Sequence, residues 1–439
     1  MTNCSSSQWI SSNLSLTGFT VANAALMTCK ELIENAIDAT RDVPEQRASL
    51  VIEANADHFV ITCNDNGRGF ASDSVDAIHT LFRSSKVGEC SVKSTGKFGI
   101  GLKAMALMSS RECGGKDVTI RSLAEDADKD VTFTIGCGDS GEVEIKSLDV
   151  SDRGSDDGGF TTTVAVCVPC CPIESFRKSL WAYLSELGRF VDSSITVSFI
   201  DEDPVVFCED SSLSRCVQYK DPSGFVSCLV SWNSDFSGEN NQLSIIRFVN
   251  GVPLVTTNGS NCLLLHGVLL SLTRLSASLG IQLGHPLVPK VDASLVASTV
   301  VVEGAPHESS WTQLVVRVNL TAPADQVDYA CLSKSSVSGL QGSNLTMVVS
   351  RCLRVALRRL QSKFASQFQS VEAFEHKNAV GRYIPVIVHN LIEMADRVQT
   401  DEIRAKLTDL LGADFDAKQK LFECLLRLLG PPKGVLVEL

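Results

Sequence analysis

Apolar residues recur at helical spacing through residues 16–40, and the shared face holds Leu26, Leu32, Ile33, Ala36 and Ile37. This periodicity predicts one helix. Alternating apolar and polar residues in 49–54 and 58–63 then predict two strands. Beyond a glycine-rich loop, we expect a helix over 102–110. The region is predicted to continue with strands over 116–122, 130–135, 160–168 and 194–200, an exposed hairpin or loop over 137–159, and a helix over 175–191.

A second unit is predicted to begin near residue 205. Its apolar runs predict strands over 225–232, 243–248 and 314–320, and a helical region over 262–279. A long helix is expected over 345–369, with Ser343 or Asn344 as its N-cap. Its polar face is basic and carries Arg351, Arg354, Arg358, Arg359 and Lys363. Shorter helical patterns follow over 382–395, 401–411 and 417–429.

Length and composition narrow the class of protein. The 439 residues suit two or three domains. With 39 Lys+Arg against 51 Asp+Glu, the net charge of −12 argues against a protein that coats nucleic acid through bulk charge, although a local basic face is compatible with it. The sequence offers neither a run of ~20 apolar residues for a membrane span nor the features of a signal peptide, so we expect a cytoplasmic or nuclear protein without a membrane partner.

The 16 cysteines lie scattered along the chain, many of them inside apolar runs. Reduced thiols within the core are the expected state for such a pattern. Cys167, Cys170 and Cys171 form the tightest group. A single CxxC without a second Cys/His pair is weak support for zinc or redox chemistry, and a structural role is favoured.

The predicted helix over 16–40 carries a polar set that suits chemistry. Glu31, Asn35 and Asp38 fall at i, i+4 and i+7, which places them on one helix face. Glu31 can polarise a water as a general base, and Asn35 offers a neutral oxygen to Mg²⁺. The alternative is the solvated face of an amphipathic helix, and this stretch alone leaves both open.

A second candidate follows the predicted strand at 58–63, where the chain continues Asp65-Asn-Gly67-Arg-Gly69. An ionised Asp65 only accepts hydrogen bonds, so it can select the exocyclic amine of adenine over a keto group. Glycines let the backbone approach a base closely. The alternative is an ordinary tight turn, since Asp-Asn-Gly is common in turns.

The third candidate is the loop Gly96-Lys-Phe-Gly99-Ile-Gly101-Leu-Lys103, which opens into the predicted helix over 102–110. Backbone N–H groups at a glycine-rich helix start can bind phosphate oxygens. The loop is neither a Walker A motif, which ends in Gly-Lys-Ser/Thr, nor a Rossmann fingerprint, which follows the first strand. Taken alone, a GxxGxG sequence is a weak signal.

The three stretches occur in order between residues 31 and 103, and together they resemble the N, G1 and G2 boxes of the GHKL ATPases (gyrase, heat-shock chaperone, histidine kinase, MutL). The resemblance implies ATP and Mg²⁺ as cofactors, Glu31 as the catalytic base and Asn35 as the magnesium ligand. It also implies nucleotide contacts from Asn35, Asp65, Gly67, Gly69, Ser85, Lys86, Gly96, Lys97, Phe98, Gly99, Ile100, Gly101, Leu102 and Lys103.

Within this superfamily, the chain resembles the B subunit of DNA topoisomerase VI. The similar stretches are Leu16-Thr-Gly-Phe, Lys30-Glu-Leu-Ile-Glu-Asn35, Leu81-Phe-Arg-Ser-Ser-Lys86, Lys97-Phe-Gly-Ile-Gly-Leu-Lys-Ala104, Arg247-Phe-Val-Asn-Gly-Val-Pro-Leu254, Arg351–Phe364 and Arg382-Tyr-Ile-Pro385. A MutL-type protein would carry GFRGEAL in place of GKFGIGLKA, and none of the seven histidines lies in a phosphoacceptor context.

The resemblance implies an α+β chain with three parts. These are a GHKL (Bergerat) α/β sandwich ATPase domain over 1–204, a transducer-like α/β domain over 205–370 and a helical C-terminal region over 371–439 that docks a partner. Two departures from the family stand out. The helix-two-turn-helix module is missing between Ile200 and Phe225, and Thr321 of the segment Arg317–Pro323 takes the place of the lysine that the family sends to the γ-phosphate. Lys334 is the alternative source of that lysine.

Two functions are therefore expected. The first is an ATP-driven clamp subunit that forms an ATP-dependent homodimer, binds DNA and works in a heterotetramer with an A-type topoisomerase VI-like or meiotic transesterase subunit. Its location would be the nucleus in a eukaryote and the cytoplasm otherwise. The second is a non-catalytic scaffold that keeps the fold, with weak or no ATP hydrolysis. Thr321 favours the scaffold, and the intact Glu31 favours the ATPase.

Overall fold

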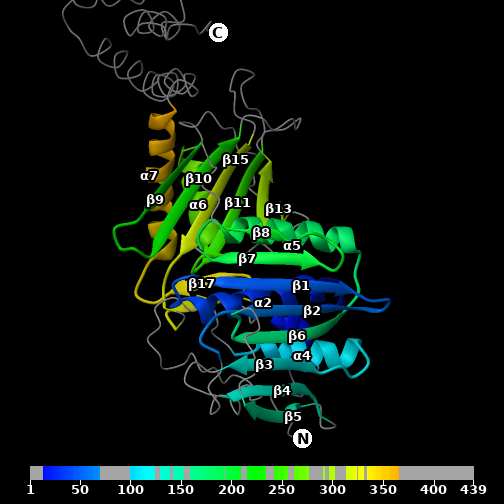
Figure 1. Cartoon of the computed structure of the whole chain (residues 1–439). Coiled ribbons are helices and arrows are strands. Elements are labelled where there is room, and N and C mark those ends of the chain that lie inside the picture. Colours follow the sequence, from blue (N-terminus) through cyan, green and yellow to red (C-terminus); the bar gives the residue numbers. More distant parts are fainter. Residues whose placement is uncertain are drawn as a thin grey trace, which may run out of the picture.

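The structure is a computed structural model of the whole chain (Figure 1). It describes residues 13–69, 99–123, 129–138, 142–152, 159–191, 193–208, 215–233, 242–255, 262–275, 290–291, 296–301, 313–323, 325–330 and 334–364. The chain is a mixed α+β protein with two main sheets, each covered by helices (Figure 1). In the described part, no helix is long and apolar enough to cross a membrane.

The first unit is built on a sheet of order β5-β4-β3-β6-β2-β1-β7-β8 within the described residues. Neighbouring strands are antiparallel except β1 and β7, which are parallel. Its strands are β1 (Arg47–Ala54), β2 (His58–Asp65), β3 (Val118–Leu123), β4 (Lys129–Cys137), β5 (Val143–Asp152), β6 (Thr162–Pro169), β7 (Ser194–Phe199) and β8 (Val205–Phe207). Its helices are η1 (Leu14–Thr17), η2 (Val21–Asn23), α2 (Ala24–Thr40), α4 (Gly101–Glu112) and α5 (Ile173–Leu187).

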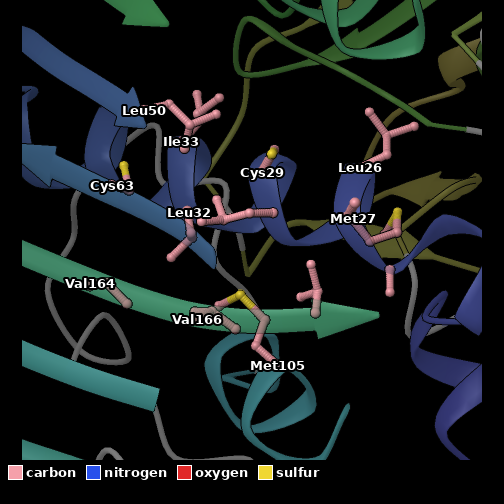
Figure 2. Packing of buried hydrophobic residues seen from close by; sticks show 14 of the residues in the cluster. Leu26, Met27, Cys29, Leu32, Ile33, Leu50, Cys63, Met105, Val164 and Val166 are labelled. Carbon is pink, nitrogen blue, oxygen red and sulfur yellow. The ribbon is translucent and has the colours of Figure 1, made fainter. Parts of the chain in front are cut away.

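Helix α2 lies in the centre of the first unit because its apolar positions are buried against the sheet. Figure 2 shows side chains from α2 packed with side chains from the strands and from α4. The labelled members of this cluster are Leu26, Met27, Cys29, Leu32, Ile33, Leu50, Cys63, Met105, Val164 and Val166. The helix predicted over 16–40 is confirmed from residue 24 onward. Two 3₁₀ turns precede it, because Gly18 adopts the left-handed region with φ 92° and ends the first of them.

The two edges of this sheet compare differently with the sequence prediction. At one edge β5 pairs antiparallel with β4, which agrees with the exposed hairpin or loop expected over 137–159. Most of its residues are exposed, including the apolar side chains of Leu148 and Val150. At the other edge β8 pairs with β7, which extends the first sheet to Phe207. The domain division at 204/205 stays a prediction, with β8 just beyond it.

The second unit contains a sheet of order β13-β14-β11-β15-β10-β9 within the described residues, with β12 paired to β11. Its strands are β9 (Cys216–Lys220), β10 (Val226–Asn233), β11 (Gln242–Val249), β12 (Val252–Pro253), β13 (Lys290–Val291), β14 (Ala297–Val301) and β15 (Gln313–Leu320). Helices α6 (Leu263–Leu275) and α7 (Leu345–Lys363) pack on one face of it. A small hairpin of β16 (Val327–Tyr329) and β17 (Val337–Leu340) precedes α7.

Both faces of the second sheet are covered, and alternate residues of β11 show how. Leu243 and Ile245 belong to the apolar cluster beneath α6 and α7. Ile246 and Phe248 instead join the core of the first unit, where the Phe248 ring lies 4.6 Å from the Phe190 ring. Burial on both faces explains why these strands are continuous apolar runs in the sequence.

Helix α7 begins as the sequence predicts. The side chain of Asn344 accepts a hydrogen bond from the backbone N–H of Met347 at 3.2 Å, which makes Asn344 the N-cap. The helix is described to Lys363, and the last residues of the predicted range lie outside the described part. The helical patterns predicted over 382–395, 401–411 and 417–429, and with them the C-terminal region 371–439, also lie outside the described residues.

Candidate functional site

Helix α2 presents Glu31 and Asn35 on the same side, one turn apart. The side chain of Glu31 is 12% exposed, and Asn35 is exposed to solvent. Asp38, which the spacing placed on this face, is instead buried and forms an ion pair with Arg41 at 3.2 Å. The site on α2 therefore consists of Glu31 and Asn35, and Asp38 has a structural contact.

The carboxylate of Glu31 lies against the first residue of α4. A Cβ atom added to Gly101 would come within 2.1 Å of the Glu31 Oε2 atom, so only glycine allows this approach. The start of an α-helix carries free N–H groups and the positive end of the helix dipole, which favour negative charge. The structure thus joins the first and third candidate stretches at one point.

Asp65 ends β2 with a buried side chain, 6% exposed. Its Oδ1 atom accepts a hydrogen bond of 2.9 Å from the backbone N–H of Gly67. Burial raises the pKa of Asp65 to about 7, although hydrogen bonds from Gly67 and from the hydroxyl of Thr162 act to lower it. A carboxylate with this pKa changes charge near neutral pH and gains from a ligand that donates a hydrogen bond to it.

The glycines after Asp65 allow close backbone packing. A Cβ atom on Gly67 would lie 2.6 Å from the backbone of Ala39, at the end of α2. A Cβ atom on Gly69 would lie 2.0 Å from the carbonyl oxygen of Leu123, and Gly69 has a left-handed φ of +69°. Substitution at either position would push the Asp65 turn away from its neighbours.

Two threonines of this site were missed by the sequence analysis. Thr162 pairs with Asp65 across β6 and β2, so both side chains point to the same face. Thr161 donates hydrogen bonds from its hydroxyl to the carbonyl oxygens of Asp65, at 3.2 Å, and Gly67, at 2.5 Å. The run of three threonines at 161–163 was the available signal, but it becomes informative only once the register of β6 against β2 is known.

Lys103 is buried and makes a hydrogen bond within its own loop. Its side chain is buried, and the Nζ atom donates a hydrogen bond of 2.6 Å to the carbonyl oxygen of Gly99. Burial lowers the pKa of Lys103 to about 8. The lysine therefore ties the glycine-rich loop to the first turn of α4. Ile100 is buried in the core, so its side chain has a packing role.

Part of the predicted nucleotide site cannot be placed. Ser85, Lys86, Gly96, Lys97 and Phe98 lie outside the described residues. The described part does bring Glu31, Gly101 and Leu102 together at the junction of α2 and α4. Asp65, Gly67 and Gly69 form the turn beside the end of α2.

Behind Glu31 lies a cluster of charged side chains. Lys30 Nζ is 3.2 Å from Glu31 Oε1 and 2.6 Å from Glu34 Oε1. Burial acts to lower the pKa of Lys30, but the charges of Glu34 and Glu31 outweigh it and raise the pKa above its usual value. The hydroxyl of Tyr183, on α5, donates to Glu34 Oε1 at 3.3 Å. Lys334 Nζ, from the second unit, lies 4.0 Å from Glu34 Oε2.

The donor set agrees with a magnesium ion held largely by a nucleotide. In the described residues, no group of three or more His, Cys, Asp or Glu side chains could hold a metal ion by itself. Mg²⁺ commonly keeps several waters and takes one or two protein oxygens together with phosphate oxygens. The exposed amide of Asn35, one turn from Glu31, fits that requirement.

The fold and the site define a class of protein. The N-terminal unit has the GHKL ATPase fold, with α2 and α4 on one face of a mixed sheet and Asp65 at the end of a central strand. Residues 21–159 match the family of histidine kinase-, DNA gyrase B- and HSP90-like ATPases. This match covers the three candidate stretches.

Similar solved structures come from type II topoisomerases. The ATPase region of Saccharomyces cerevisiae topoisomerase II is 12% identical, with 78% of this chain and 86% of that chain covered and a TM-score of 0.46. The B-subunit of DNA gyrase from Myxococcus xanthus is 14% identical, with 81% and 95% covered and a TM-score of 0.49. The ATPase and transducer domains of DNA topoisomerase II from Balamuthia mandrillaris are 12% identical, with 80% and 87% covered and a TM-score of 0.46. No curated protein matches the sequence.

Proposed function

We propose that this chain is the ATP-binding B-type subunit of a topoisomerase VI-like complex. In this role it forms an ATP-dependent clamp and controls double-strand DNA cleavage by an A-type transesterase subunit. The observation that carries the ATPase part is the contact of the Glu31 carboxylate with the start of α4, with Asn35 beside it. The topoisomerase VI-like part rests on the sequence resemblance.

The proposed chemistry assigns one task to each group. Ionised Asp65 accepts a hydrogen bond from the adenine amine, and the N–H groups at the start of α4 hold phosphate oxygens. Asn35 holds Mg²⁺, which supplies charge neutralisation at the phosphates when bound. Glu31 orients a water for attack on the terminal phosphate and accepts its proton. Lys103 keeps the loop before α4 in place through the Gly99 carbonyl.

A substitution of Glu31 tests the ATPase assignment. Glu31→Gln keeps the size of the side chain and removes the base, so turnover should fall roughly 10²–10⁴-fold while calorimetric ATP affinity is retained. Glu53→Gln, at an exposed glutamate of β1, is the matched control and should leave both quantities unchanged. Turnover that persists in Glu31→Gln contradicts the assignment.

The scaffold function remains the second candidate because of Thr321. Its backbone N–H bonds the Phe225 carbonyl at 2.7 Å, and its hydroxyl accepts a hydrogen bond of 3.4 Å from Asn319. Position 321 thus brings no cation toward the nucleotide. Lys334 does carry a positive charge from the second unit to α2, where it faces the carboxylate of Glu34. ATP binding without turnover in the wild-type chain favours the scaffold.

The basic face of α7 has two interpretations, a solvated helix face and a stripe that contacts DNA phosphates. Arg351 binds Asp221 through Nη2 at 2.8 Å, Arg359 stacks over the ring of Tyr219, and Lys363 donates to the Cys216 carbonyl at 3.3 Å. These contacts hold α7 against β9 and favour a structural role for the three residues. Neutralising exposed Arg358 together with Arg354 should reduce the salt dependence of DNA binding if the stripe faces phosphates.

The partner and the location are also proposals. We expect an ATP-dependent homodimer in a heterotetramer with A-type subunits, located in the nucleus if the organism is a eukaryote. The C-terminal region 371–439 is the proposed docking segment. Deleting residues 412–439 should abolish co-purification with the A-type subunit, and unchanged co-purification would exclude this part of the segment.

A further inference from the structure

Glu34 is shared by two lysines that come from different units of the molecule. Its Oε1 atom takes Lys30 at 2.6 Å, and its Oε2 atom faces Lys334 at 4.0 Å. The Glu34 side chain is only 5% exposed and those of Lys30 and Lys334 are 3% and 13% exposed, so water screens these charges weakly. Lys30 also contacts Glu31, three residues before Glu34, at 3.2 Å.

We propose that Glu34 is a positioning residue through which the second unit controls the catalytic carboxylate, an inference that rests on the proposed ATPase function. Glu34 holds Lys30 and thereby limits how strongly Lys30 pairs with Glu31. Lys334 competes with Lys30 for the same carboxylate. The position of Lys334 therefore determines how strongly Lys30 pairs with Glu31.

The geometry gives the competition a direction. A glutamate paired with a lysine is a weaker base, because the positive charge stabilises its ionised form. When Lys334 approaches Glu34, Lys30 is held less by Glu34 and neutralises Glu31 more. When Lys334 withdraws, Glu34 draws Lys30 away and Glu31 becomes the stronger base. No movement of the backbone of α2 is needed for this effect.

The backbone at Lys334 has an uncommon conformation. Lys334 adopts a left-handed backbone with φ 54°. The other non-glycine residues with positive φ in the described part are Asp201 and Asn250, whose types adopt this region more readily. The hairpin that places Lys334 also brings Tyr329 near α2, since the charges of Glu34 and Asp38 help burial to raise the pKa of Tyr329.

Steady-state kinetics of the full chain test the inference through Glu34→Gln. The amide can still accept hydrogen bonds from Lys30 and Tyr183, which protects folding, but it no longer attracts Lys30 by charge. Lys30 then pairs more strongly with Glu31 and makes it a weaker base. As a result, kcat should drop about tenfold, while KM and calorimetric ATP affinity change less than about twofold. Tyr183→Phe is the matched control, because it removes a neutral contact to the same Oε1 atom and leaves every charge in place.

A double-mutant cycle with Lys334→Met tests the competition itself. In the otherwise wild-type chain, Lys334→Met should raise kcat about two- to fivefold, as expected for the loss of a single ion pair of 4.0 Å from a carboxylate that keeps Lys30. In the Glu34→Gln background, the same change should have no effect. Hydrogen exchange in the nucleotide-free chain gives a readout independent of activity: both substitutions should speed exchange in the β16–β17 hairpin, and Tyr183→Phe should not.

The outcomes separate this inference from the proposed function. Unchanged kcat in Glu34→Gln, alongside loss of turnover in Glu31→Gln, overturns the role of Glu34 and leaves the ATPase assignment intact. A loss of turnover in Lys334→Met that is equal in both backgrounds also overturns it, because Lys334 would then act elsewhere. Turnover that survives in Glu31→Gln refutes the ATPase assignment itself.

Discussion

Two ion pairs join the second unit to the first in the described residues, and they are built differently. Arg317, on β15, binds Glu186 at the end of α5 with two hydrogen bonds of 2.6 and 2.8 Å. A third nitrogen of Arg317 donates to Ser231 at 2.8 Å. Lys334 makes a single contact of 4.0 Å with Glu34 from a residue in a left-handed conformation.

The two cations also differ in how rigidly they are held. Arg317 lies on a regular strand, β15, which is paired with β10 on one side and β11 on the other. Its planar guanidinium group is fixed by three hydrogen bonds to two residues, so the pair has one geometry. Lys334 has a flexible stem and a point charge that can turn to another acceptor. We infer that Arg317–Glu186 is a fixed anchor between the units and that Lys334–Glu34 is an adjustable contact.

The largest effect is expected from removing the anchor. Arg317→Met leaves Glu186, 15% exposed, without its cation, and this should lower the free energy of unfolding by about 3 kcal/mol. Urea denaturation followed by circular dichroism measures the loss. Lys146→Met is the control, because its ion pair with Glu144 also spans 2.6 Å but the two side chains are 33% and 50% exposed. That control should cost less than about 1 kcal/mol, and equal losses in the two variants would contradict the anchor.

Neither ion pair between the two units could be predicted from the sequence, although many helices, strands and site residues of the first unit could. The helix at 24–40 and strands β1 and β2 follow local periodicity, and the places of Glu31, Asp65 and Gly101 follow motif spacing. These signals lie within a few turns of chain. Lys334 meets Glu34 only after both units fold, and the sequence could name it solely as an alternative to Thr321.

Polar residues misled the sequence analysis where tertiary contacts decide their burial. Asp38 was placed on the same open face as Glu31 by helical spacing, but Arg41 pairs with it below the surface. Arg351 is 58% exposed, as expected for the basic face of a helix, but it also binds the buried carboxylate of Asp221, a partner that the spacing could not show. Periodicity predicts which face a residue occupies and gives no information about the partner that covers it.

A medium effect is expected at Asp65, where we propose that the adenine amine binds. The pKa of Asp65 is about 7, raised by burial, and the adenine amine requires its ionised form. Below pH 7 Asp65 must lose a proton when ATP binds. The ATP dissociation constant should therefore rise by up to tenfold for each unit by which the pH falls below 7, and it should be constant above about pH 8. Calorimetry across pH 5.5–8.5 measures this.

Asp65→Asn supplies the control for that pH series. The terminal phosphate of ATP itself titrates near pH ~6, so part of the dependence belongs to the ligand and remains in the variant. The additional midpoint near neutral pH should disappear when residue 65 no longer titrates. Arg317→Met and Lys334→Met should keep that midpoint, because neither residue contacts Asp65. A midpoint that persists in Asp65→Asn would assign it to another group.

The smallest effect is expected from the adjustable contact. Lys334→Met should change the free energy of unfolding by less than about 0.5 kcal/mol, because the pair spans 4.0 Å and Glu34 keeps its closer partner Lys30. Lys334→Gly should be more stable than Lys334→Met by about 1 kcal/mol, since glycine adopts φ 54° without the steric cost that a side chain incurs. Urea denaturation of the two variants compares them directly. If Lys334→Met costs as much as Arg317→Met, Lys334 anchors the units as firmly as Arg317, and the distinction between a fixed and an adjustable contact is wrong.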